Sequence, residues 1–140
     1  MNPDKKIRAA VVGVGYLGKF HAEKYGNHPG VTLAGVVDTD SAQAQTVAEK
    51  TGTRAFADYR QLFGQVDAVS IAVPTHLHYE IAKDFLNQGV DVLIEKPITR
   101  TVAEADELIA LAEKKACIIQ VGHLERFNPA VVAVRNQVVR

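Results

Sequence analysis

Hydrophobic residues in this chain gather in short runs that alternate with longer segments of helical periodicity. The runs are Ile7–Val12, Val31–Val37, Arg54–Phe56, Val66–Val73, Val90–Ile94 and Ala116–Val121. A short apolar run bounded by turn residues is typical of a strand that is covered on both faces of a parallel sheet. The pattern therefore predicts six strands, most of them in parallel order.

The intervening segments carry the start and stop signals of helices. Helices are expected from Gly18 to about His28, from Ser41 to Lys50, from the Pro74–His78 segment to about Gln88, from Thr101 onward, and after Pro129. Asp40 and the capping box Thr101–Glu104 suit helix starts, whereas Gly52 and Gly89 suit helix ends. Strands that alternate with helices predict an α/β fold of three layers, a doubly wound, mostly parallel sheet of the Rossmann type.

The spacing of apolar residues also predicts which helix faces are buried. The expected inner faces are Leu17, Phe20 and Tyr25 on the first helix, Ile81, Ala82, Phe85 and Leu86 on the third, and Val102, Ala105, Leu108, Ile109 and Ala112 on the fourth. The last helix is apolar at Val131, Val134 and Val138.

Composition is that of one ordinary globular domain of 140 residues, with 47% hydrophobic and 23% charged residues. Because 16 basic residues balance 16 acidic ones, no basic surface indicates a nucleic-acid partner. No apolar run approaches the length of a membrane span, and the N-terminus lacks the apolar stretch of a signal peptide. The single cysteine, Cys117, cannot form an internal disulfide, which favours a reducing cytoplasm.

The first strand ends in the sequence Gly13-x-Gly15-x-x-Gly18, and a helix follows at once. Gly13 permits a sharp turn, Gly15 lets a pyrophosphate approach the backbone, and Gly18 lets the helix pack closely on the strand. The helix N-terminus offers unpaired N–H groups to the phosphates. These features predict a dinucleotide site.

Asp38 ends the second strand, 20 residues after Gly18, where a carboxylate can accept hydrogen bonds from an adenosine ribose. The alternative is a plain turn or capping acid, although Asp40 can cap the next helix without it. The charge of Asp38 repels a 2′-phosphate, and no Lys or Arg lies between Val37 and Glu49 to neutralise one. We therefore expect NAD rather than NADP.

Ligands of doubly wound sheets bind outside the carboxyl ends of the strands. The segments expected there are Gly13–Gly18, Asp38, Pro74–His78, Glu95–Pro97 and Gly122–Pro129. Lys96 follows a buried strand directly, so we expect it in low-dielectric surroundings, where it could donate a proton to an alkoxide. Pro97 biases the backbone of Lys96 to an extended conformation, and the pattern is compatible with a cis or a trans Lys96–Pro97 peptide bond. A surface lysine at a strand end is the alternative.

Other polar residues have plainer alternatives. His76 and His78 cap or pack a helix start more often than they catalyse, and Thr75 can cap that helix. Arg126 can pair with a phosphate or carboxylate, but loop arginines are usually solvated. His21 and His28 are expected on a helix surface, and no metal site is expected because no second ligand lies at metal spacing.

Taken together, the motifs Gly13-x-Gly15-x-x-Gly18, Asp38, Pro74-Thr75-His76-Leu77-His78, Glu95-Lys96-Pro97 and Gly122-His123-x-x-Arg126-Phe127-x-Pro129 resemble the Gfo/Idh/MocA oxidoreductases over essentially the whole chain. The resemblance implies cofactor contacts from Gly13, Gly15, Tyr16, Leu17, Gly18, Asp38, Pro74, Thr75, His78 and Glu95. It implies that Lys96 binds the reacting hydroxyl and assists proton transfer, and that His123 and Arg126 face the substrate. The Gly122–Pro129 segment is most similar to members that act on UDP-N-acetylhexosamines.

Members of that family are more than twice as long, and a second α+β domain supplies most substrate contacts. The resemblance thus implies that residues 1–128 form the NAD-binding domain and that 129–140 begin a linker helix toward a substrate domain that is absent from this chain. The face made by Val131, Val134 and Val138 would then lack part of its cover and promote a homo-oligomer, which a monomer at high concentration in sedimentation would contradict.

The function expected from the sequence is hydride transfer between nicotinamide and a sugar hydroxyl, on a sugar or nucleotide sugar, with no nucleic-acid or membrane partner. The fragment alone is expected to be inactive. Alternatives are an NAD-binding sensor without turnover and an S-adenosylmethionine methyltransferase, although Glu95-Lys96-Pro97 disfavours the latter. A P-loop is excluded because Phe20 follows Gly18-Lys19.

Overall fold

The computed structural model describes residues 6–138. Residues 1–5 of the predicted NAD-binding domain and residues 139–140 of the predicted linker helix lie outside the described residues. Within these residues six strands form one sheet: β1 Ile7–Val12, β2 Val31–Val37, β3 Ala55–Phe56, β4 Ala68–Ile71, β5 Asp91–Ile94 and β6 Ile119–Val121. Every pairing is parallel and the spatial order is β3-β2-β1-β4-β5-β6. The predicted doubly wound Rossmann sheet is confirmed.

Residues 6–138 contain five α-helices, of which the first four lie between strands and the last follows β6: α1 Gly18–Gly26, α2 Ser41–Thr51, α3 His78–Asn87, α4 Val102–Lys115 and α5 Pro129–Val138. Short 3-10 turns occur at Tyr59–Leu62, Thr75–Leu77 and Leu124–Phe127. The predicted caps are confirmed: Asp40 caps α2, Thr101 and Glu104 form a capping box on α4, and Gly52 ends α2 in a left-handed conformation.

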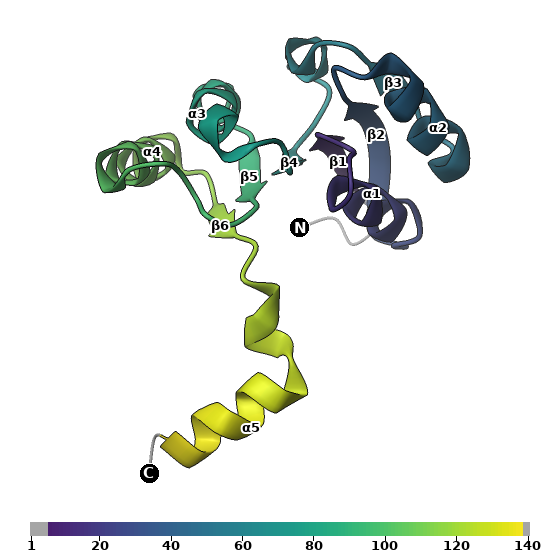
Figure 1. Cartoon of the computed structure of the whole chain (residues 1–140). Coiled ribbons are helices and arrows are strands. Elements are labelled where there is room, and N and C mark those ends of the chain that lie inside the picture. Colours follow the sequence, from purple (N-terminus) through teal and green to yellow (C-terminus); the bar gives the residue numbers. More distant parts are fainter. Residues whose placement is uncertain (1–5, 139–140) are drawn as a thin grey trace.

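The direction in which successive strands are added to the sheet reverses between β1 and β4, which lie side by side in the centre of the sheet. From β1 the chain winds outward through β2 to β3, then returns to build β4, β5 and β6 on the other side (Figure 1). The loops after β1 and β4 therefore diverge at their carboxyl ends. Such a switch point is where open α/β sheets bind ligands.

Two hydrophobic clusters cover the two faces of the sheet. Successive residues of β1 point to opposite faces of the sheet and so belong to different clusters. Val11 packs with Ala22 of α1 and Val47 of α2, whereas Val12 belongs to the larger cluster. That larger cluster gathers Phe85 and Leu86 of α3 and Leu108 and Ala112 of α4. This is the three-layer arrangement that the sequence predicts.

The predicted inner face of α1 is wrong in part. Leu17 is 41% exposed and Phe20 is 45% exposed, whereas Ala22 is buried and Tyr25 packs on the smaller cluster. The reason is Gly18, at which an added Cβ would lie only 1.8 Å from the carbonyl oxygen of Gly13. This contact turns the Gly18–Ala22 side toward the sheet, and position 20, about 200° away, faces outward.

Three other expectations need correction. On α4, Val102 and Ile109 are exposed, because the buried stripe is narrow and runs through Leu108 and Ala112. Ala116 does not begin a strand: it ends α4 with φ +53°. Cys117 likewise precedes β6 and is half-buried, and its burial, aided by nearby Asp91, raises the pKa of its thiol.

The last helix, α5, extends away from the sheet (Figure 1). Its residues Val131, Val134 and Val138 are exposed, together with Phe127 just before it. None of the helices within residues 6–138 combines the length and apolar character needed to cross a membrane.

Tyr59 links the turn after β3 to α3. Its hydroxyl donates a 2.7 Å hydrogen bond to Asp84 Oδ2, and its ring packs on Phe63 and Phe85. Burial, followed by the bond and the charge of Asp84, raises the pKa of Tyr59. The folded protein thus holds the phenol proton more tightly than the unfolded chain does.

We expect Tyr59→Phe to lower the free energy of unfolding by about 1 kcal/mol at pH 7. The raised pKa stabilises the fold fully below the unfolded pKa of about 10, and this stabilisation is lost as pH rises above it. In urea unfolding between pH 7 and 11, the gap between wild type and Tyr59→Phe should therefore shrink. Tyr16→Phe, at an exposed ring, is the matched control; a gap independent of pH would refute the assignment.

Candidate functional site

The glycine loop after β1 is tightly fixed on one side and open on the other. Gly13 has φ +84°, and a Cβ there would lie 2.7 Å from the carbonyl oxygen of Ala72 at the end of β4. Gly18 is closed off by Gly13, as described above. Around Gly15, by contrast, a Cβ would meet nothing within 4 Å. Two glycines thus serve packing, and Gly15 alone leaves space that a ligand could occupy.

Side chains from the neighbouring strand and helix clamp the loop. Asp38 Oδ2 accepts a 2.9 Å hydrogen bond from the backbone N–H of Val14, and Gln43 Nε2 donates a 2.8 Å bond to the Val14 carbonyl. Asp38 Oδ1 accepts from the Asp40 backbone N–H at 3.0 Å. Asp38 does not cap α2, because Asp40 does. Each carboxylate oxygen can accept more than one bond, so Asp38 can still receive ribose hydroxyls.

A cavity of about 450 Å³ opens at the switch point. Of the residues expected to contact a cofactor, Gly13, Gly15, Asp38 and Pro74 line it. No side chain caps the N-terminus of α1 beside it. The cavity therefore combines an open glycine, a carboxylate and an uncapped helix start, which fits the phosphates and adenosine ribose of a dinucleotide.

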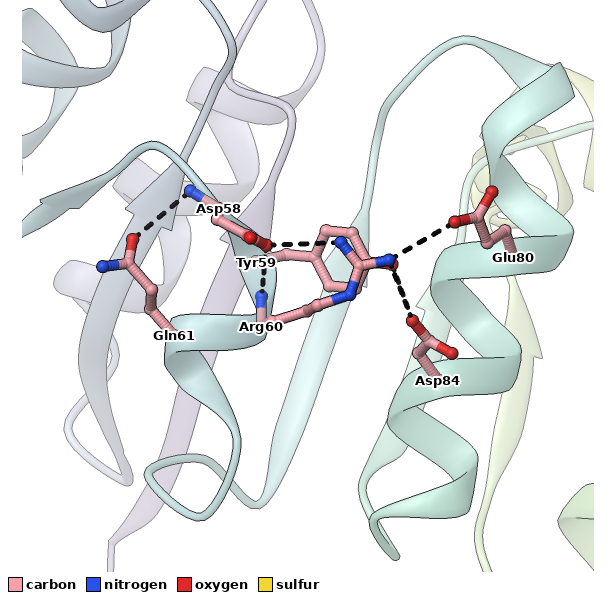
Figure 2. A network of polar contacts seen from close by, with 6 residues as sticks. All are labelled: Asp58, Tyr59, Arg60, Gln61, Glu80 and Asp84. Atoms are coloured by element: carbon pink, nitrogen blue, oxygen red, sulfur yellow. Dashed lines mark hydrogen bonds and ion pairs between the residues drawn. The ribbon is translucent and has the colours of Figure 1, made fainter.

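Arg60 also lines this cavity, a cation that sequence reasoning missed because it considered only residues between Val37 and Glu49. Figure 2 shows it bridging from the turn after β3 to α3. Its guanidinium lies 3.4 Å from Glu80, 3.5 Å from Asp84 and 3.7 Å from Asp58. Because three carboxylates surround it, Arg60 is poorly placed to balance the charge of a 2′-phosphate.

A second hollow, of about 390 Å³, lies beyond β5 and β6. Its lining includes Leu17, Glu95, Lys96, His123, Arg126 and Val131. The structure thus brings together the residues expected to meet the substrate, Lys96, His123 and Arg126, with Glu95 beside them. Tyr16, Gly18, Thr75 and His78 line neither of these two hollows.

Lys96 is exposed, so the expected low-dielectric surroundings are not present around it. Ile94 and Glu95 just before it are buried, but the chain leaves the sheet there and Lys96 lines the open hollow. The Lys96–Pro97 peptide bond is cis.

His78 is buried, and both of its ring nitrogens lie within hydrogen-bond distance of backbone carbonyl oxygens. Its Nε2 lies 2.8 Å from the carbonyl oxygen of Val73, and its Nδ1 lies 3.0 Å and 3.2 Å from those of Pro97 and Ile98. It thereby joins the loop after β4 to the loop after β5. Thr75 does not cap α3, which starts without a side-chain cap. A cofactor contact from either residue remains a prediction.

His21 is not a surface residue. Its Nε2 lies 3.1 Å from Glu95 Oε1, and the two side chains are 14% and 6% exposed. Sequence spacing could have signalled this, since position 21 lies within one turn of Gly18 on the packed part of α1. His28 is exposed as expected. Among residues 6–138, no group of three His, Cys, Asp or Glu side chains could hold a metal ion.

Residues 7–123 match a family described as "Oxidoreductase family, NAD-binding Rossmann fold", Gfo/Idh/MocA. The chain belongs to the Gfo/Idh/MocA oxidoreductases. It is 42% identical over 129 residues to a UDP-N-acetylglucosamine 3-dehydrogenase of Acidithiobacillus ferrooxidans, which covers 92% of this chain and 41% of that protein. It is 35% identical over 138 residues to an inositol 2-dehydrogenase of Rubrobacter xylanophilus, covering 96% of this chain and 40% of the relative.

Solved structures of Gfo/Idh/MocA proteins agree with this fold. The A. ferrooxidans enzyme superposes with a TM-score of 0.87 at 41% identity, over 94% of this chain and 43% of that one. A scyllo-inositol dehydrogenase of Lactobacillus casei with bound NAD(H) and scyllo-inositol gives a TM-score of 0.86 at 25% identity, over 96% and 41%. This chain therefore spans about two fifths of these relatives and is an NAD-binding Rossmann domain of the family.

Proposed function

We propose that this chain is the cofactor-binding part of an NAD-dependent dehydrogenase that oxidises a hydroxyl of a sugar or nucleotide sugar. The observation that carries the proposal is the cavity at the switch point, where open Gly15 and half-buried Asp38 face the uncapped start of α1. Bound there, NAD would accept hydride from an alcohol carbon. The chain's own residues would position the cofactor and handle the proton.

In this proposal the pyrophosphate lies over Gly15 at the start of α1, with Tyr16 and Leu17 beside it, and Asp38 binds the adenosine ribose. Pro74, Thr75 and His78 belong to the wall of the nicotinamide half, with His78 acting through the backbone it holds. Glu95 contacts the nicotinamide ribose. Lys96 reaches the reacting hydroxyl from the second hollow and takes part in moving its proton.

The substrate would enter the hollow that contains Lys96, His123 and Arg126. Arg126 is exposed there and can pair with a phosphate or carboxylate. The similarity to a UDP-N-acetylglucosamine dehydrogenase favours a nucleotide sugar, whereas the inositol dehydrogenases among the relatives suggest an uncharged polyol. A diphosphate substrate would use Arg126, so we favour the nucleotide sugar.

The first test is calorimetric titration of this chain with NADH and, in parallel, NADPH. We expect saturable NADH binding and NADPH binding at least about tenfold weaker, since the 2′-phosphate would approach the charge of Asp38. S-adenosylmethionine in the same cell is the control for a methyltransferase. Binding of S-adenosylmethionine but of neither nucleotide would refute the proposal.

A purely sensory NAD-binding module is the second candidate, and the exposed, uncovered Lys96 is the observation that favours it for this chain taken alone.

We also infer that exposed Val131, Val134 and Val138 take part in a homo-oligomer. Sedimentation as a monomer at high concentration would contradict this. The single cysteine agrees with a proposed cytoplasmic location.

A further inference from the structure

A buried contact between an imidazole and a carboxylate joins the helix of the glycine loop to the loop that carries Lys96. Glu95 follows β5 and its carboxylate is almost wholly buried, with Oε1 3.1 Å from Nε2 of His21. His21 comes from the first turns of α1. The two residues are 74 positions apart in sequence, so the contact couples two separate walls of the site.

The remaining surroundings of Glu95 leave it little freedom. Its Oε2 accepts a hydrogen bond from the backbone N–H of Lys96 at 3.3 Å. On the other side Gly122 closes in, since a Cβ there would lie 2.8 Å from Oε1. Oε1 receives no well-aligned hydrogen bond from any described residue. His21 is thus the polar group placed to meet this oxygen, and a buried carboxylate is costly without one.

The backbone on both sides of this contact is anchored. Gly18 packs α1 against Gly13, which fixes where His21 can be. The Glu95 backbone N–H bonds to the Ile71 carbonyl at 2.9 Å, which fixes the end of β5 against β4. Because both backbones are fixed, the His21 side chain that reaches across from α1 determines how the Glu95 carboxylate is oriented.

We propose that His21 is a positioning residue, which holds the Glu95 carboxylate, and through it the Lys96 backbone, in register with the pyrophosphate loop. His21 itself touches no cofactor. The proposal rests on the proposed function, in which Glu95 contacts the nicotinamide ribose. It predicts that the loss of His21 disturbs the nicotinamide half of the site and spares the adenosine half.

The test compares two ligands, NADH and ADP, on the 140-residue chain. His21→Leu should weaken NADH binding about tenfold, because the buried Glu95 carboxylate loses the imidazole that faces it. ADP, which has the phosphates but no nicotinamide ribose, should bind within about twofold of wild type. A general loosening of α1 would instead weaken both ligands, since both would use its N-terminus. His21→Gln, which keeps an N–H donor, should recover part of the loss, and His28→Leu on an exposed ring should change neither ligand.

A double-mutant cycle checks that His21 acts through Glu95. With Glu95→Gln already in place, His21→Leu should reduce NADH binding by less than about twofold. Equal losses for NADH and ADP, or independent effects of the two substitutions, would overturn the inference.

The same double-mutant cycle, measured by urea unfolding without any ligand, distinguishes failure of the proposed NAD-binding function from failure of the positioning role of His21. If the wild-type chain binds no NADH, the proposed function fails, but His21 and Glu95 should still be coupled by about fivefold or more in the unfolding constant. No coupling there would defeat the positioning role, whatever the cofactor result.

Discussion

Gly15→Ala should leave the fold intact and abolish most NADH binding, whereas Gly18→Ala should strongly destabilise the domain. At Gly15 a new Cβ meets nothing within 4 Å, so we expect the free energy of unfolding to change by less than about 0.5 kcal/mol. The same methyl group fills the space through which the pyrophosphate would approach, and NADH should bind about 100-fold more weakly.

At Gly18 a Cβ would lie 1.8 Å from the backbone oxygen of Gly13, which cannot move without breaking the end of β1. We expect Gly18→Ala to cost about 3 kcal/mol of stability. Urea unfolding and calorimetry measure the two effects separately. Gly26→Ala, where the nearest atom would be an ordinary 3.5 Å away, is the control for an added methyl on α1. Undiminished NADH binding by Gly15→Ala would show that no pyrophosphate passes there.

The second large effect concerns the choice between NADH and NADPH. Combining Asp38→Ser with Thr39→Arg removes the carboxylate and adds a cation at residues that line the same cavity. We expect NADH binding to fall about 10- to 100-fold, the equivalent of one hydrogen bond to a charged group, and NADPH to become the tighter ligand. Parallel titration with both nucleotides measures the ratio.

Asp38→Asn separates the charge from the shape of this side chain. It keeps an oxygen that can accept from the Val14 N–H, so the loop should stay clamped, but it no longer repels a phosphate. We expect it to reduce the preference for NADH without reversing it. If the ratio is unchanged in both variants, Asp38 does not bind the ribose, and its role is to hold the backbone of Val14 and Asp40.

The order of helices and strands could be predicted from the sequence because local sequence signals determine it. Apolar runs, the capping box at Thr101 and the glycine at Gly52 each act over a few residues, and each is confirmed. Strand limits were set too wide, as in β4, because the apolar run Val66–Val73 stays buried or half-buried on both sides of the strand Ala68–Ile71.

The features that were missed depend on contacts between distant segments. Phe20 was expected inside because it is apolar, but the close contact of Gly18 with Gly13 decides which side of α1 faces the sheet. His21 was expected outside, yet it meets Glu95. Arg60 was not considered because it follows β3, far from Asp38 in sequence. Only the winding of the sheet brings such residues together.

The central place of β1 has a consequence for how the chain is made. β1 is synthesised before the other strands of this sheet, but it pairs with β2 on one edge and with β4 on the other. After β2 ends at Val37, the second edge of β1 stays unpaired until Ile71, the last residue of β4, has been synthesised. At about 5–20 residues per second on the ribosome, that edge stays open for roughly 2–7 seconds. During this interval the half-built sheet is most vulnerable to pairing with another nascent chain, so a chaperone should matter most there.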